Sequence, residues 1–116
     1  MPPGGAGPAS KELLVCIGLV VLYTERLEEC RDFYSGLGLA FAREKHGAGP
    51  EHYAAVLGEG VVLELYPASS ARPATGSLRL GLVVRGKDAV AVGPAQLTGR
   101  QIVTDPDGRT VDVLVR

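Results

Sequence analysis

Two short sequence patterns occur twice along this chain of 116 residues. The first pattern is the tetrapeptide Gly-Leu-Val-Val, which begins at Gly18 and again at Gly81. The second is a glycine followed by an acidic residue with an apolar residue on each side, and the acidic residue is Glu64 in one copy and Asp112 in the other. Such self-similarity indicates a repeated structural unit. The two copies of the second pattern are separated by fewer residues than the two copies of the first. The difference is about the length of one helix with its cap. We therefore expect two β-α-β-β-β units, the second with its helix shortened or lost.

The first unit contains the strongest helix pattern. Residues 17–23 are mostly β-branched and apolar, as a strand prefers, and Thr24 can cap a helix that follows. Apolar side chains then recur at three- and four-residue steps, so one helix face is apolar and is expected to be buried. These side chains are Leu27, Cys30, Phe33, Tyr34 and Leu37. Gly36 and Gly38 are expected to end the helix, because glycine readily adopts the left-handed conformation of helix ends.

The rest of the chain predicts short strands joined by turns. Strands are expected over residues 53–57, 61–66, 78–84, 100–104 and 110–115, with turns at 58–60 and 105–108. The segment 43–52, REKHGAGPEH, is expected to be a loop that carries both histidines. Residues 87–91 could form one helical turn at most, because Gly86 and Gly93-Pro94 bracket them closely. A strand at residues 90–92 stays open as the alternative.

The predicted organisation is a single domain, as the chain length indicates. Residues 1–12 begin with a stretch of Pro, Gly, Ala and Ser and are expected to form a disordered tail. The domain then spans 13–116, with module one at 13–67, a linker at 68–76 and module two at 77–116.

The composition excludes several classes of function. A hydrophobic content of 46% and a net charge of -1 are typical of a soluble globular protein, and without a basic surplus nucleic acid is not an expected partner. The sequence has no apolar run of about 18 residues and no secretion-signal pattern, so no membrane partner is expected. We expect a cytoplasmic protein in which Cys16 and Cys30 are reduced, buried thiols.

Three stretches of the sequence are similar to a known family: IGLVVLYTERLEECRDFYSGLGLAF, GVVLELYP and DPDGRTVDVLV. Together they resemble the vicinal oxygen chelate (VOC) superfamily, which includes glyoxalases, bleomycin-resistance proteins and extradiol dioxygenases. The resemblance implies an α+β fold in which two βαβββ modules form curled mixed sheets around a cleft. It also implies a homodimer, since in many members a second chain completes that cleft.

Enzymes of this family commonly hold a divalent metal with four side chains. In chain order, the first is typically His or Gln, the second Glu, the third His and the fourth Glu. The resemblance places these positions at Leu19, Glu64, either Arg79 or Leu82, and Asp112. Leucine offers no donor atom and an arginine repels a cation. We therefore expect no metal of the family type and no other cofactor.

Glu64 is the best single candidate for a functional residue. Strand alternation places it on the opposite face from Leu63 and Leu65, and a half-buried carboxylate in an apolar cleft needs a partner, for which Arg79 or His52 is suited. Two other interpretations of Glu64 remain open: it could form a purely structural ion pair, or it could lie on a solvated face. The same alternatives apply to Asp112. The candidate ligand contacts are Leu19, His52, Tyr53, Glu64, Tyr66, Arg79 and Asp112, and a catalytic residue is unknown beyond Glu64.

The two histidines allow several interpretations. Their loop is either solvated or folds over the mouth of the cleft, where His52 or Tyr53 would touch a ligand. A metal held by His46, His52 and Glu64 is geometrically possible but is not the expectation.

Three functions are compatible with these residues. The first is a metal-free protein that binds a small aromatic or cationic molecule, as drug-resistance members of the family do, with tyrosines as stacking surfaces and acids as negative charges. The second is a lyase, isomerase or dioxygenase relative with an irregular metal site or with Glu64 as general base. The third is an accessory domain without a ligand.

Overall fold

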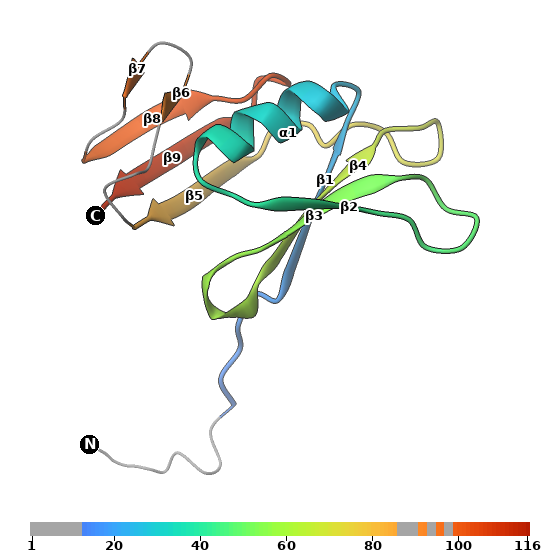
Figure 1. The fold of residues 1–116 in the computed structure, drawn as a ribbon, viewed down its shortest axis with the longest axis horizontal. Coiled ribbons are helices and arrows are strands. Elements are labelled where there is room, and N and C mark those ends of the chain that lie inside the picture. Colours follow the sequence, from blue (N-terminus) through green and yellow to red (C-terminus); the bar gives the residue numbers. More distant parts are fainter. Residues whose placement is uncertain (1–12, 86–90, 93–94, 97–98) are drawn as a thin grey trace.

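The computed structural model describes residues 13–85, 91–92, 95–96 and 99–116, and seven of the strands in these ranges form two mixed sheets (Figure 1). The first sheet has the order β1-β4-β3-β2 and the second the order β5-β9-β8. The first sheet consists of β1 (Leu19–Thr24), β2 (Phe41–Glu44), β3 (His52–Val56) and β4 (Val62–Pro67). The second consists of β5 (Arg79–Val84), β8 (Arg100–Thr104) and β9 (Thr110–Val115). A short antiparallel pair, β6 (Ala91–Val92) and β7 (Ala95–Gln96), follows β5.

The two sheets share one pairing scheme. In each sheet the first and last strands run parallel, β1 with β4 and β5 with β9, and an antiparallel strand, β3 or β8, lies on the other side of the last one. This repetition confirms the predicted α+β fold with two βαβββ-like modules. The expected helical turn at residues 87–91 lies mostly outside the described residues, and no helix occurs in the parts of 77–116 that the structure describes.

The helix α1 (Leu27–Gly36) carries the predicted apolar face, and this face packs into one core shared by both sheets. Cys30, Tyr34 and Leu37 are fully buried. They pack with Leu22, Leu63 and Leu65 of the first sheet and with Val111 and Val113 of β9. Thr24 does not cap the helix directly. Its hydroxyl accepts a hydrogen bond from the Arg26 backbone N–H at 2.9 Å, in the turn that leads into the helix.

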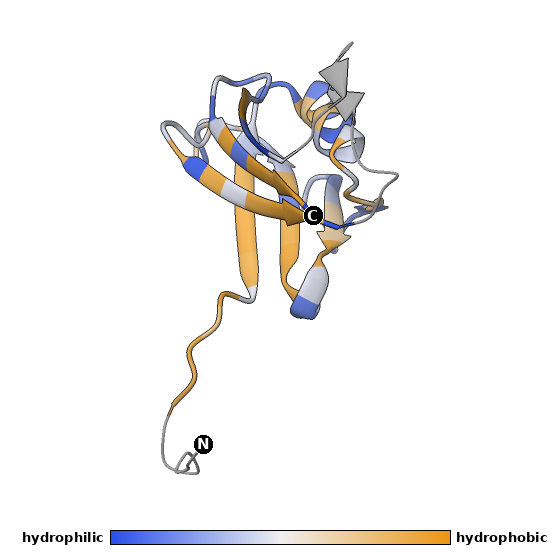
Figure 2. Cartoon of the chain, turned by 90° about the vertical axis from the view of Figure 1, so that its left-hand side faces the viewer, coloured by the Kyte–Doolittle hydropathy of each residue, from blue (hydrophilic) through white to orange (hydrophobic). Residues whose placement is uncertain are grey.

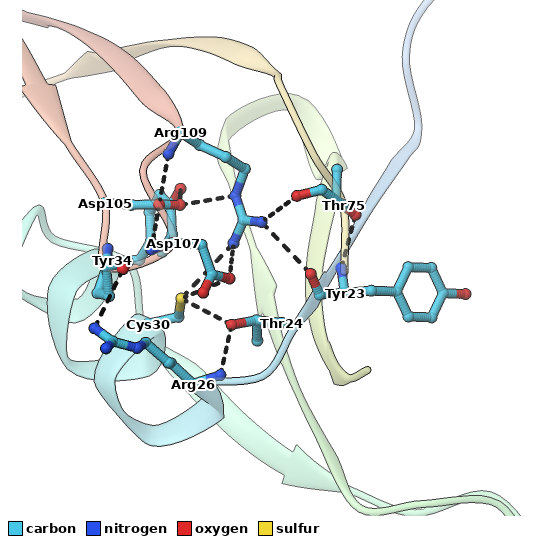
Figure 3. Close-up of polar contacts among 10 residues, drawn as sticks. Tyr23, Thr24, Arg26, Cys30, Tyr34, Thr75, Asp105, Asp107 and Arg109 are labelled. Atoms are coloured by element: carbon cyan, nitrogen blue, oxygen red, sulfur yellow. Dashed lines mark hydrogen bonds and ion pairs between the residues drawn. The ribbon is translucent and has the colours of Figure 1, made fainter. Parts of the chain in front are cut away.

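A buried polar cluster joins the two modules beside this core (Figure 3). The Arg109 guanidinium donates to Asp105 at 2.8 Å, to Asp107 at 3.0 Å and to the Thr75 carbonyl oxygen at 2.9 Å. The Tyr34 hydroxyl donates to Asp105 at 2.7 Å. Arg109 and Asp105 are almost completely buried, so this ion pair satisfies charges that would otherwise be costly. We call this group the Arg109 cluster.

Two local expectations were wrong. The loop predicted at 43–52 is shorter than expected, because Arg43 and Glu44 belong to β2 and His52 is the first residue of β3, which starts one residue earlier than predicted. Cys16 is exposed, since residues 13–18 are hydrophobic but extend away from the body of the protein (Figure 2). Leu19, one of the candidate ligand contacts, is 55% exposed. The tail predicted at 1–12 lies outside the described residues, and none of the described helices is long and apolar enough to cross a membrane.

Candidate functional site

The first sheet has one face covered by α1 and one face without a helix, which we call the free face. Leu22, Leu63 and Leu65 point to the covered side and are buried in the core. Side chains alternate along a strand, so the intervening residues lie on the free face. From β1 to β2 these are Leu19, Val21, Tyr23, Val62, Glu64, Tyr66, His52, Ala54, Val56, Ala42 and Glu44.

A row of aromatic rings crosses the free face at one end. The register aligns Tyr23 with Tyr66 on neighbouring strands, and their ring centroids are 5.9 Å apart. His52 stacks on Tyr66 with ring centroids 4.0 Å apart and an interplanar angle of 11°. The ring of His46, in the loop between β2 and β3, has its centroid 5.1 Å from that of His52. His52 thus has two aromatic neighbours and is 1% exposed.

The polar surroundings of His52 are asymmetric. On one side of the ring, Nδ1 lies 3.2 Å from the Pro50 carbonyl oxygen. On the other side, Nε2 lies 3.4 Å from Glu44 Oε1 and 3.8 Å from Glu64 Oε2. Nε2 is buried, yet it has no hydrogen-bond partner among the described residues. Two carboxylates therefore face a buried ring nitrogen without a direct hydrogen bond to it.

A depression of about 650 Å³ lies at the tyrosine end of this row. Its walls come from the ends of β1 and β4, from the β2–β3 loop and from the segment after β4. The lining residues are Tyr23, Ala48, Pro50, Tyr66, Pro67, Ala68, Ser69 and Arg72. Desolvation raises the pKa of the Tyr66 hydroxyl, and the nearby Glu64 carboxylate raises it further. The phenol therefore stays neutral near pH 7, and it offers both a flat ring and a hydroxyl.

The second sheet holds a separate ion pair on its own uncovered face. Arg79 donates to both carboxylate oxygens of Asp112, from Nε at 3.0 Å and from Nη2 at 3.1 Å. These hydrogen bonds raise the pKa of the Arg79 guanidinium, which stays charged. The two side chains satisfy each other in the bidentate geometry that arginine and carboxylate prefer.

The four positions of the family metal do not fit a metal in this chain. Leu19 pairs with Val62, so Val21 is the residue beside Glu64 on β1, and neither aliphatic side chain offers a donor atom. Asp112 is engaged by the Arg79 guanidinium. Glu64 is the one remaining donor at these positions, and a single carboxylate does not make a transition-metal site.

The structure brings some of the sequence-predicted site residues together and separates others. His52, Glu64 and Tyr66 are neighbours on the free face, and Leu19 lies further along it. Tyr53 lies on the covered face, where its hydroxyl donates to the Glu28 carboxylate at 2.7 Å. The Arg79–Asp112 pair described above is on the other sheet.

Two neighbours of the site were not found by sequence reasoning. Tyr23 and Glu44 belong to it because of the strand register, which pairs Tyr23 with Tyr66 and Glu44 with His52. The alternation of β1 could have placed Tyr23 on the same face as Leu19. The sequence carries no comparable signal for Glu44, because its position depends on where the β2–β3 loop begins and ends.

Comparison with known proteins finds likeness in the fold. No family model and no curated protein sequence matches this chain. Among solved structures, TnmS3, an antibiotic-binding protein from Streptomyces sp. CB03234, is 23% identical, with 90% of this chain and 98% of that one covered and a TM-score of 0.56. The oxidase ChaP-H2 is 14% identical, with 90% and 95% covered and a TM-score of 0.58. An integron cassette protein from V. cholerae is 19% identical, with 90% and 97% covered and a TM-score of 0.53.

These alignments span nearly the whole of each protein, so the chain has the overall fold of an antibiotic-binding protein and of an oxidase. Identities this low describe the fold alone, and one fold hosts many activities.

Proposed function

We propose that this chain belongs to the VOC superfamily and that it binds a small aromatic organic molecule on the free face of the first sheet. The observation that carries the proposal is the row Tyr23–Tyr66–His52, which borders a depression of about 650 Å³. A depression of this size suits a drug-sized ligand. Flat rings at its edge favour stacking with another aromatic system.

Charge adds selectivity to this site. Glu64 is only 16% exposed at its side chain and lies beside Tyr66 on β4, so its carboxylate favours a ligand with a positive or hydrogen-bond-donating group. Arg72 also lines the depression and favours an acceptor there. TnmS3, an antibiotic-binding protein, has a similar fold, which supports the proposal that the ligand is a small organic molecule.

A ligand screen tests the proposal. Planar aromatic antibiotics and metabolites are screened for an increase in melting temperature, in buffer that contains a chelator, because a ligand that prefers the folded state stabilises it. For the best compound, Tyr23→Ala is expected to weaken binding about tenfold, since it removes one stacking surface. Glu64→Gln tests the contribution of the carboxylate.

Asp32→Asn is the matched control, because Asp32 is an exposed acid of α1, which covers the opposite side of the first sheet from the free face. It should leave the affinity unchanged. If a broad set contains no stabilising compound, or if Tyr23→Ala and Glu64→Gln bind as the native chain does, the proposal is wrong.

The same site is proposed to function in a homodimer. The free face of the first sheet exposes Leu19 and Val56, and the corresponding face of the second sheet exposes Val83 and Ile102, at 55–73% of their surface. Exposed aliphatic side chains gathered on sheet faces indicate an interaction surface. A two-fold arrangement would cover the face of one module with that of the partner chain, and it would turn the open depression into a cleft.

A further inference from the structure

A group of potential metal ligands lies at the edge of the free face, at positions other than the four family positions. Donor atoms of Glu44, His46 and His52 all lie within 4.8 Å of one another. The three residues come from a single hairpin: Glu44 ends β2, His52 begins β3, and the loop between them carries His46. The antiparallel register places Glu44 directly opposite His52, so the sheet itself holds two of the three donors in place.

The hydrogen bonding of His52 identifies which ring nitrogen is free. The Pro50 carbonyl oxygen can only accept, so the Nδ1 atom 3.2 Å away carries the proton in this contact. A neutral ring then presents its lone pair at Nε2. That lone pair is buried and faces the Glu44 and Glu64 carboxylates, which are acceptors as well. Acceptors that face one another without a donor are unfavourable unless a cation lies between them.

The spacing of the donors matches a metal ion. Glu44 Oε1 lies 3.4 Å from His52 Nε2 and 3.5 Å from His46 Nε2. In a tetrahedral site with metal–ligand bonds of about 2.0–2.1 Å, the ligand atoms lie about 3.3–3.4 Å apart. Both separations from Glu44 Oε1 are therefore close to those that an ion between the donors requires, and they are too long for strong direct hydrogen bonds. The donor atoms of the two imidazoles lie within 4.8 Å of each other.

We propose that Glu44, His46 and His52 bind a divalent transition-metal ion of the Zn²⁺, Co²⁺ or Ni²⁺ class. Two imidazoles and one carboxylate suit these ions better than Mg²⁺ or Ca²⁺, which prefer oxygen donors throughout. The Pro50 carbonyl orients the His52 ring from the side away from the ion, as backbone carbonyls do for metal-bound histidines. Three protein donors leave a coordination position for water or another ligand. The His46 side chain is 70% exposed, so the ion can enter from solvent.

This site stands independently of the proposed function, because it concerns the metal alone. Its position next to Tyr66 places the open coordination position near the ligand depression, so a bound molecule with a donor atom could reach the ion. A failure of metal binding would leave the aromatic site intact, and the ligand screen in chelator tests that site separately.

A Co²⁺ titration of the untagged full chain tests the proposal. After treatment with chelator, visible absorption is expected to show one Co²⁺ per chain with the intense bands of low-coordinate cobalt, displaced by one equivalent of Zn²⁺. His46→Ala and Glu44→Gln should each weaken binding about 100-fold, because each removes a ligand. His46 lies in a loop and Glu44 is partly exposed, so neither change disturbs the core.

Glu51→Gln is the matched control: Glu51 is an exposed acid of the same loop that pairs with Arg43 at 3.7 Å. It should bind Co²⁺ as the native chain does. Nitrogen-15 NMR of the histidine rings with Zn²⁺ should shift the Nε2 signal of His52 and leave its Nδ1 protonated. Absence of Co²⁺ binding, binding that survives in both ligand variants, or an equal loss in Glu51→Gln would overturn the proposal. The proposal would also be overturned if the His52 ring stayed doubly protonated with Zn²⁺ present. In that case a proton on Nε2, and not a metal ion, would lie between the ring and the Glu44 and Glu64 carboxylates.

Discussion

Cys16 and Cys30 show how strongly the surroundings of one residue set its chemistry. Cys16 lies in the extended segment before β1 and is exposed. Cys30 lies on the inner face of α1, where its sulfur is 3.4 Å from the Thr24 hydroxyl. Burial raises the pKa of the Cys30 thiol, and the Asp107 and Asp105 carboxylates nearby raise it further. The thiolate, which is the reactive form, is therefore disfavoured at Cys30.

Labelling with N-ethylmaleimide at pH 7 is expected to modify Cys16 quickly and Cys30 at least about 100-fold more slowly, since Cys30 must first be exposed by local unfolding. Intact-mass spectrometry counts the adducts over time. The native chain should gain one adduct quickly, and a second only in denaturant. In the Cys16→Ser variant the fast adduct should disappear, and two fast adducts in the native chain would contradict the structure.

At the scale of elements, α1 and the turn between β8 and β9 are held together by the Arg109 cluster. Tyr34 of α1 reaches Asp105 of that turn, and Arg109 reaches back to main-chain oxygens of Tyr23 and Thr75 (Figure 3). Desolvation raises the pKa of the Tyr34 hydroxyl, and its hydrogen bond to Asp105 raises it further, so the phenol remains a donor. Contacts between residues so far apart in sequence hold the two modules in one arrangement.

Tyr34→Phe is expected to lower the free energy of unfolding by about 1.5–3 kcal/mol, because it removes a buried hydrogen bond to a charged group. Urea unfolding followed by circular dichroism measures this loss. Tyr23→Phe is the control: Tyr23 enters the cluster through its main chain, and Figure 3 shows its ring directed away. The control should stay within about 0.5 kcal/mol of the native chain. If Tyr34→Phe and Tyr23→Phe lowered the free energy of unfolding equally, the hydrogen bond of the Tyr34 hydroxyl would not stabilise the fold specifically.

At the scale of the whole molecule, the part of the chain that the structure describes leaves one face of each sheet uncovered. The core lies between the covered faces and α1, and it uses the inward residues of both modules. The outward residues include exposed aliphatic side chains, among them Val56 and Val83. Burying each such side chain would contribute about 1.5–3 kcal/mol, so a second copy that covers them would be favoured.

Val83→Asp is expected to convert the proposed homodimer into a monomer, because it would bury a charge in the interface. Light scattering during gel filtration measures the mass, and circular dichroism checks that the fold persists. Ser35→Asp, on an exposed position of α1, should leave the dimer intact. A native chain that is monomeric at micromolar concentration would contradict the dimer proposal.

Much of the fold could be predicted from local patterns. The strands at 100–104 and 110–115 and the turn between them occur as expected, and β4 and β5 begin within one residue of their predicted positions. These patterns are informative because strand alternation, glycine and proline act over a few residues. The candidate site was less predictable, because Glu44 and Tyr23 join it through pairing between strands. Register depends on loop geometry and packing, which a single sequence does not display.

The sequence by itself determined the type and order of most of the elements, the apolar face of α1 and the presence of an isolated acid, Glu64, within an apolar strand. Only the tertiary structure decided that Glu64 lies beside His52, that Arg79 is engaged by Asp112, and that Glu44 and the two histidines converge. The physical reason is that periodicity reports which way a side chain points along its own strand. Which side chains meet is decided by the pairing of strands and by the core that holds the sheets together.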